Sequence, residues 1–182
     1  MAVSQPAIVA DAGPFAIYTV LKVTGSTSAV LNKCRVIHSL VDEINANQPG
    51  ANLKAALSFS AAFCQENGIV TPEDFVDFRA LGQGDTQAPA TDCDILLHAH
   101  STRHDLNFFL LRKFLSDISS DVSVVDETYG YRYLDSRDMT GFIDGTENPD
   151  GDDARRDVAI IADGDCAGGS VVMMQRYVHD LN

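Results

Sequence analysis

The chain has 182 residues, which is enough for one domain with its own hydrophobic core and part of another. Hydrophobic residues make up 45% of it and charged residues 21%, proportions that exclude a disordered or fibrous protein. Its formal net charge of −13 repels phosphate backbones and anionic membrane surfaces, so we expect neither nucleic acid nor a membrane as a partner.

Four segments rich in β-branched and aromatic residues predict strands, and two amphipathic stretches between them predict long helices. The predicted strands are residues 15–23, 53–59, 94–100 and 122–133, the last with a bend near Gly130. The first long helix starts near Val30 and has the apolar face Val30, Cys34, Ile37, Val41 and Ile44. The second long helix has Asp105 as its predicted N-cap and the apolar face Phe108, Leu111, Leu115 and Ile118.

Between the second and third strands, Pro72 and the acids that follow it predict a short helix that opens at residues 71–74, and residues 82–89 predict a loop. The order β-α-β-(α)-β-α-β is typical of the ferredoxin-like fold, an α+β domain with an antiparallel sheet and its helices on one face. We expect this domain to occupy residues 1–135.

Residues 136–182 differ from the first domain in kind. The last 48 residues, from Asp135 onward, carry a net charge of −7, more than half of the total. They contain a polar loop at 141–153 and two apolar runs, 158–162 and 170–178, that predict strands joined by a glycine-rich hairpin at 164–169. Two strands cannot close a core alone, so we expect the start of an incomplete second ferredoxin-like half.

The loop around Asp144 is the most informative stretch for function. Asp144 follows the apolar residues Phe142 and Ile143, and glycines flank all three. Partial desolvation raises the pKa of a carboxyl group and suits it to proton transfer. The alternative is an Asx-turn, in which the carboxylate caps its own backbone. A calcium loop of EF-hand type does not fit the spacing, although a looser ion site would.

Histidines supply a second candidate site. His98 and His100 alternate along a predicted strand and share one face, and His104 follows closely, so the three imidazoles could gather around zinc or copper. Structural histidines with hydrogen-bond partners fit the same spacing. His179 stands beside Asp180 but lies near the end of the chain.

The four cysteines form no CxxC pair, which favours free, buried thiols. Neither a secretion signal nor a run of about eighteen apolar residues is present in the sequence. We therefore expect a cytoplasmic protein.

The nine residues 141–149 read GFIDGTENP and resemble the GxxDG signature of the dye-decolorising peroxidases, bacterial cytoplasmic branch. Segments 94–98, 101–108, 167–170 and 175–181 extend the resemblance over essentially the whole chain. Members of this family are haem enzymes built from two ferredoxin-like halves of the dimeric α+β barrel type. The resemblance therefore implies a haem-dependent peroxidase that reduces hydrogen peroxide and oxidises dye-like or phenolic substrates.

By this resemblance, Asp144 is the catalytic acid and base that moves a proton between the oxygens of hydrogen peroxide. The residues expected against haem b are Ile143, Asp144, Gly145, Thr146, Glu147 and Gln175. Arg155, Arg156 and Arg176 are the candidates for binding its propionates. The proximal histidine of the family is expected beyond residue 182, so no residue of this chain is predicted to bind the iron. His179 does not match that ligand by motif.

Two other functions fit the same sequence. The chain could be a truncated, haem-free ferredoxin-like module that forms homo-oligomers through exposed strands. It could also handle haem without peroxidase turnover. For the peroxidase we expect hydrogen peroxide and small aromatic substrates as partners, and a homo-oligomer.

Overall fold

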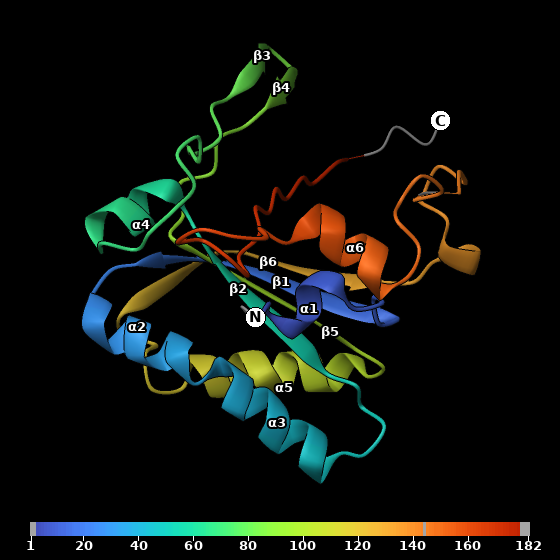
Figure 1. The fold of residues 1–182 in the computed structure, drawn as a ribbon, viewed down its shortest axis with the longest axis horizontal. Helices are drawn as coiled ribbons and strands as arrows, with labels where there is room; N and C mark the ends of the chain where they lie inside the picture. The colour runs from blue at the N-terminus through green and yellow to red at the C-terminus, as the bar shows by residue number, and fades with distance from the viewer. Residues whose placement is uncertain (1–2, 144, 179–182) are drawn as a thin grey trace.

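The computed structural model describes residues 3–143 and 145–178. Within them, four strands form one antiparallel sheet in the order β2-β5-β1-β6 (Figure 1). These strands are β1 (Phe15–Val23), β2 (Lys54–Phe59), β5 (Ile95–Ser101) and β6 (Val122–Tyr131). In the register of the sheet, Tyr18 of β1 lies opposite His98 of β5 on one side and Thr128 of β6 on the other. This strand order is that of the ferredoxin-like fold, so the predicted fold class is confirmed.

Helices α2 (Thr27–Arg35), α3 (Ile37–Asn47) and α5 (His104–Leu115) cover one face of the sheet (Figure 1). Because side chains alternate along a strand, Ile17 and Leu21 of β1 and Leu97 of β5 all point toward these helices. They are fully buried together with Leu110 and Phe114 of α5. The hydrophobic core of the first domain therefore lies between this face and the three helices.

The opposite side of the sheet carries α1 (Pro6–Val9) and α6 (Asp152–Ala159), which come from the two ends of the chain (Figure 1). In α1, Pro6 occupies the first turn, and Ala7 and Val9 are buried. This arrangement brings a C-terminal segment onto the first domain next to the N-terminus.

The connection between β2 and β5 differs from the prediction. A helix, α4 (Ala61–Glu66), begins there because the Ser60 hydroxyl accepts a hydrogen bond from the Phe63 N–H at 3.2 Å. The helix predicted to open at 71–74 is wrong: residues 71–80 contain only a turn, closed by the Phe75 N–H and the Pro72 carbonyl at 3.1 Å.

The predicted loop at 82–89 is instead a short hairpin, β3 (Leu81–Gln83) and β4 (Thr86–Ala88), which projects from the body of the molecule (Figure 1). Gly84 provides the positive φ, +57°, that its two-residue turn requires. Its six strand residues are all exposed, so no hydrophobic pattern marked them in the sequence.

The single long helix predicted after β1 is two helices, α2 and α3. Val36 separates them with φ −100° and ψ 4°, and its N–H bonds the Lys33 carbonyl at 3.2 Å in a tighter turn. The predicted apolar face is nevertheless buried throughout, at Val30, Cys34, Ile37, Val41 and Ile44.

Helix α5 begins one residue before the predicted cap. Its N-cap is Arg103, and Asp105 lies in the first turn, where its carboxylate pairs with the Arg103 guanidinium at 2.5 Å. The hydrogen bond from Arg103 lowers the pKa of Asp105. Phe108 is 41% exposed rather than part of the core. Leu111 and Ile118 are buried as predicted, alongside Leu106, Leu110 and Phe114.

Strand β6 ends at Tyr131, two residues earlier than predicted, and it is not bent at Gly130, which pairs regularly with Ala16. The pairing of β6 with β1 is irregular at another point, where its register shifts between Val20 and Leu21 of β1. A 3-10 helix, η1 (Leu134–Ser136), follows β6.

The strands predicted at 158–162 and 170–178 are wrong. Val158 belongs to α6, and the described residues 160–178 contain no strand. Asp152 and Asp153 favour the helix because acids stabilise the first turn. The glycine-rich segment at 164–169 is a turn without flanking strands, closed by the Ile161 N–H and the Gly169 carbonyl at 2.9 Å. The division at residue 135 and the incomplete second half stay predictions.

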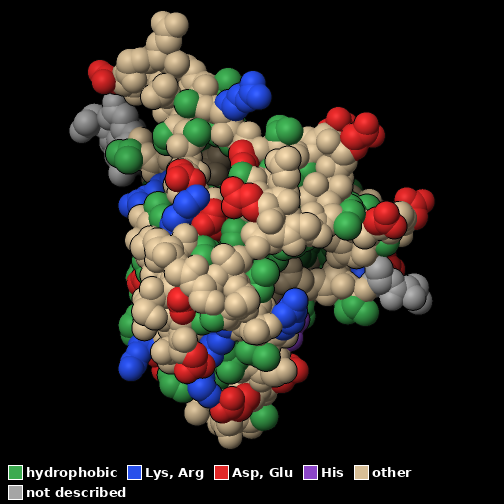
Figure 2. Space-filling view, turned by 90° about the vertical axis from the view of Figure 1, so that its left-hand side faces the viewer, with side chains coloured by type: hydrophobic (Ala, Val, Ile, Leu, Met, Phe, Trp, Pro, Cys, Tyr) green, Lys and Arg blue, Asp and Glu red, His purple; other side chains and the backbone are tan. Residues whose placement is uncertain are grey.

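The surface charge agrees with the composition. On the face shown in Figure 2, the described Lys and Arg side chains are interspersed with Asp and Glu and form no continuous basic surface. No helix among the described residues is long and apolar enough to cross a membrane.

Candidate active site

The segment before Asp144 is a tight loop that closes on itself. Arg137 and Ile143 form an antiparallel bridge. The Asp138 N–H donates to the Phe142 carbonyl at 3.0 Å, and the Arg137 Nη1 donates to the Gly141 carbonyl at 2.8 Å. These bonds fix the chain direction at the residue immediately before Asp144.

An Asx-turn does occur in this loop, but at Asp138. Its Oδ1 accepts from the Thr140 N–H at 2.8 Å, and its carbonyl accepts from the Gly141 N–H at 3.0 Å. Asp144 itself lies outside the described residues, so both the acid–base role and the Asx-turn alternative stay predictions for it.

The segment after Asp144 is a second turn. Gly145 has φ +74°, and its carbonyl accepts from the Asn148 N–H at 3.0 Å. This positive φ favours glycine, and a Cβ atom here would also lie 2.7 Å from the Asn148 side-chain Nδ2, which would have to move aside. The predicted haem-contact residues Thr146 and Glu147 are exposed. The loop therefore presents short backbone turns and accessible side chains on both sides of Asp144.

The apolar side chains beside Asp144 do not pack into the protein. Phe142 is 75% exposed and Ile143 is 57% exposed. Among the described residues, the loop thus offers an accessible apolar surface to a ligand or to another protein segment.

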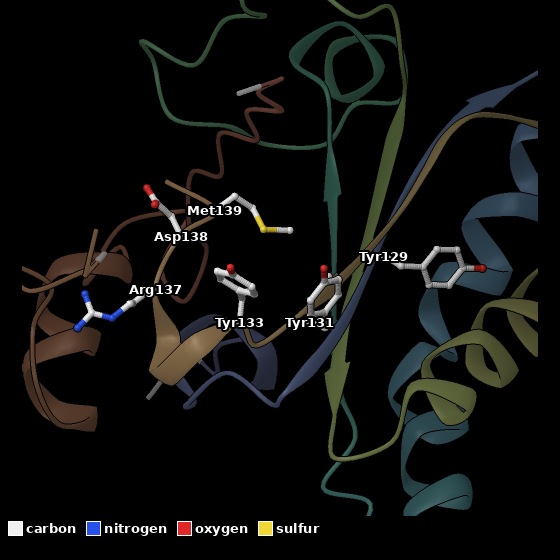
Figure 3. A pocket seen from close by; sticks show the side chains of 7 residues that line it. Tyr129, Tyr131, Tyr133, Arg137, Asp138 and Met139 are labelled. Atoms are coloured by element: carbon white, nitrogen blue, oxygen red, sulfur yellow. The ribbon is translucent and has the colours of Figure 1, made fainter. Parts of the chain in front are cut away.

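A hollow of about 350 Å³ lies beside this loop, at the ends of β1 and β6. A second, neighbouring hollow of about 290 Å³ is shown in Figure 3, where Tyr131, Tyr133 and Met139 lie close together above the end of β6. Arg137 and Asp138, which order the loop, line it as well. Tyr129 points the other way, toward the helices, where its ring stacks on His104 at 4.9 Å (Figure 3).

The three histidines considered as a candidate metal site do not come together. His98 and His100 share one face, with ring centroids 5.8 Å apart, whereas His104 stacks on Tyr129 and contacts Phe15 on the helix side. No group of three His, Cys, Asp or Glu side chains among the described residues could hold a metal ion. His179 lies outside those residues.

The remaining candidates for haem contacts have other partners. Arg155 pairs with Asp11 at 2.6 Å, and Arg176 pairs with Asp126 at 3.0 Å. Gln175 is exposed and accepts a hydrogen bond from the Tyr177 hydroxyl at 2.9 Å. It does not lie on a strand, contrary to the prediction, and its role and those of the arginines stay predictions.

Sequence reasoning did not identify the residues that shape the loop. Bonds from Arg137 and Asp138 hold its backbone in place, yet both residues precede the glycine-flanked segment 141–149 on which the sequence prediction was based. The Asp138-Met139-Thr140 sequence is a recognisable Asx-turn signal and could have predicted half of this arrangement.

The cysteines follow the prediction only in part. All four are free; Cys34 and Cys64 are buried, and Cys93 and Cys166 are half-buried. Burial raises the pKa of the Cys34 thiol to about 11, which keeps it protonated and unreactive at neutral pH.

The sheet order, the helices on one face and the glycine-flanked loop define an α+β protein of the ferredoxin-like class with a candidate site after the last strand of its sheet. Family models identify it further. The Dyp-type peroxidase N-terminal model matches residues 5–132, and the C-terminal model of the same family matches residues 135–182. The chain therefore belongs to the Dyp-type peroxidase family.

Similar proteins that carry names support this family assignment. The dye-decolorizing peroxidase of Mycolicibacterium paratuberculosis is 38% identical over 98% of this chain and 51% of its own length. That of Mycobacterium tuberculosis is 34% identical over 99% of this chain and 55% of its own. The chain thus spans about half the length of the curated relatives it matches.

Solved structures show the same similarity. A dye-decolorizing protein from V. cholerae superposes with a TM-score of 0.88 and 55% identity, over 91% of this chain and 55% of that one. DyPB from Rhodococcus jostii RHA1 gives a TM-score of 0.77 and 31% identity over 92% of this chain and 54% of that one. A variant of DypB from that organism was solved in complex with haem.

Proposed function

We propose that this chain belongs to a haem-dependent peroxidase that reduces hydrogen peroxide and oxidises dye-like or phenolic substrates. The observation that carries the proposal is the coincidence of the family match with the loop around Asp144. The described residues on both sides of Asp144 form ordered turns and leave their side chains accessible, as a residue that meets peroxide requires.

The loop fits one face of a flat, apolar cofactor. Ile143 is 57% exposed, and a glycine at 145 lets the backbone approach a planar ring closely. We assign Ile143, Gly145, Thr146 and Glu147, with Gln175, to contacts with haem b. The haem iron supplies the centre at which peroxide binds and its O–O bond breaks.

In this proposal Asp144 handles the proton. With haem bound, its carboxylate would accept one proton of hydrogen peroxide and return it to the departing oxygen, which would leave as water, while the other oxygen atom and the two oxidising equivalents would pass to the haem. The surrounding glycines give the loop its turns, and Arg137 holds the Gly141 carbonyl. We expect the cytoplasm as location, hydrogen peroxide and small aromatic molecules as partners, and a homo-oligomer as the assembly.

A second candidate is favoured by the segment 170–178, where apolar side chains are exposed. Val171 is 63% exposed, Met173 67% and Tyr177 67%. Such a surface tends to associate with another polypeptide, as a haem-free ferredoxin-like oligomerisation module would require. A haem-handling protein without turnover is the remaining alternative.

One pair of variants tests the proposed mechanism. In the haem-reconstituted protein, Asp144→Asn should keep haem, seen as an unchanged Soret absorbance per chain, while the rate of reaction with peroxide falls by roughly 100-fold or more. Asp150→Asn, an exposed acid in the same segment, is the matched control and should react normally.

Other results would select the other functions. A wild-type rate in Asp144→Asn removes that residue from the mechanism. Haem binding without peroxide-dependent oxidation of a phenol selects haem handling. Absence of haem together with concentration-dependent association in sedimentation selects the oligomerisation module.

A further inference from the structure

Residues 5–14, here called the N-terminal strap, are anchored on the sheet at two points. The Gln5 side chain bonds the Leu57 backbone of β2 at 2.7 and 2.8 Å. At the other end, the Gly13 N–H donates to His100 Nδ1 at 3.0 Å, and a Cβ on Gly13 would lie 2.5 Å from the Ser101 carbonyl oxygen. The strap is therefore a fixed part of the first domain.

Arg155 of α6 reaches this strap and the end of the candidate active-site loop with one side chain. Its Nη2 lies 2.6 Å from Asp11 Oδ1, and its Nη1 donates to the Val9 carbonyl at 3.2 Å. Its Nε donates to the Pro149 carbonyl at 3.4 Å. Because the guanidinium group carries five N–H donors in a rigid plane, it can hold all three acceptors at once.

The burial of Arg155 supports a fixed position. Its side chain is 24% exposed although both of its acidic partners, Asp11 and Asp152, lie at the surface. The neighbouring Arg156 is exposed, and its bond to the Ser4 hydroxyl is 3.4 Å long. Arg155 thus connects the loop to the strap, whereas Arg156 bonds Ser4, which precedes the strap.

The segment between Asp144 and α6 has a glycine at each end, one in the second turn and the other at the N-cap of α6. Gly145 and Gly151 have φ +74° and +83°, values that glycine adopts readily but holds weakly. A side chain that ties Pro149 to the strap restricts the turn between them.

We infer that Arg155 is a positioning residue: by joining the Pro149 carbonyl to Val9 and Asp11 of the N-terminal strap, it sets where the Asp144 loop lies relative to the first sheet. Its importance for catalysis rests on the proposed function, but the contact itself does not. Through this contact the N-terminal strap helps to shape the candidate site, although Asp11 lies more than 130 residues before Asp144 in the sequence.

Hydrogen exchange of the protein without haem tests the contact directly. The probe is the Asn148 amide, which donates to the Gly145 carbonyl at 3.0 Å. Arg155→Met and Asp11→Asn should each speed its exchange by at least about fivefold, because local opening becomes easier. Amides of β5 should exchange as in the wild type, and Arg156→Met is the matched control on the same helix.

If Arg155→Met does not fold, Asp11→Asn still tests the contact, because Asp11 is 86% exposed and its replacement should leave the fold intact. Unchanged Asn148 exchange in both Arg155→Met and Asp11→Asn overturns the inference, and so does an equal effect of Arg156→Met. In the haem-loaded protein, Arg155→Met should also slow the peroxide reaction, measured per bound haem, by about five- to tenfold. Faster exchange in a protein without peroxidase activity would uphold the contact and overturn the proposed function alone.

Discussion

The side-chain amide of Gln5 forms two hydrogen bonds with the backbone of Leu57: its Nε2 donates to the Leu57 carbonyl at 2.7 Å, and its Oε1 accepts from the Leu57 N–H at 2.8 Å. Leu57 lies on β2, an edge strand of the sheet. These two backbone groups are the ones that a further strand would pair with. Gln5 therefore imitates a neighbouring strand and closes the edge at this point.

Replacement of Gln5 should weaken the fold through this contact. Gln5→Glu keeps the size of the side chain, but a carboxylate cannot donate to the Leu57 carbonyl and is repelled by it. We expect the free energy of unfolding to fall by about 1–3 kcal/mol in urea denaturation. Gln65→Glu, at an exposed position of α4, is the matched control and should change stability by less than about 0.5 kcal/mol. Equal stability of the two variants would contradict the assigned contact.

The sheet and its core could be predicted because their signals are local. The run of β-branched and aromatic residues in β1 predicts the strand, and apolar residues at steps of three and four predict the buried face of α2 and α3. The role of Gln5 could not be predicted, because its partner lies 52 residues away and its own neighbours carry no pattern. Val158 shows the opposite failure: an apolar run resembles a strand, but a strand forms only where another strand pairs with it.

The candidate site could likewise be predicted only where its signals are local. The glycines and the Asn-Pro turn at 141–149 identify the loop from sequence because they dictate backbone shape. The arginines that hold it could be named but not placed. Arg155 bonds Val9 across a separation of 146 residues, and only the packing of α1 beside α6 brings the two together.

Gly13 should tolerate no side chain. A Cβ there would lie 2.5 Å from the Ser101 oxygen and 2.8 Å from its nitrogen, and both are backbone atoms that cannot move aside cheaply. Gly13→Ala should therefore destabilise the protein by about 1–3 kcal/mol. Gly130→Ala is the control, since its Cβ would meet only the Ala16 Cβ at 3.5 Å and the Tyr18 ring at 3.8 Å. Thermal unfolding followed by circular dichroism should separate the two, and a Gly13→Ala midpoint no lower than that of Gly130→Ala would be evidence against the close contact.

Lys22 pairs with two carboxylates that differ in burial, so their removal should differ in cost. Asp92 and Asp94 lie 2.8 and 2.9 Å from its Nζ, and both raise the pKa of Lys22, Asp92 first. The Asp94 side chain is 10% exposed and also accepts from the Val23 N–H at 2.8 Å, whereas Asp92 is 86% exposed. Asp94→Ala should cost about 2 kcal/mol because it removes a largely buried carboxylate and leaves the partly buried Val23 N–H unpaired. Asp92→Ala should cost at most about 0.5 kcal/mol. Similar urea midpoints for the two variants would contradict this ranking.

His98 makes stability depend on pH. Its ring stacks on Tyr18 with centroids 4.8 Å apart, on the sheet face opposite the main core. Burial, and then the charge of His100, lower the pKa of His98 to about 4. The folded state therefore holds a neutral imidazole at pH values where the unfolded chain has already bound a proton.

The sign of the pH effect follows from that difference. Because the unfolded histidine titrates near pH 6.5 and the folded one near 4, the stabilisation is complete above about pH 6.5 and is lost as the pH falls toward 4. Since the ring is not fully buried, we expect this residue to account for about 2 kcal/mol of that loss. Urea unfolding at several pH values should show a smaller loss in His98→Gln than in the wild type, because glutamine does not titrate. His38→Gln, at an exposed position of α3, is the matched control and should follow the wild-type curve. Parallel curves for the wild type and His98→Gln between pH 4 and 6.5 would show that His98 is not the group responsible.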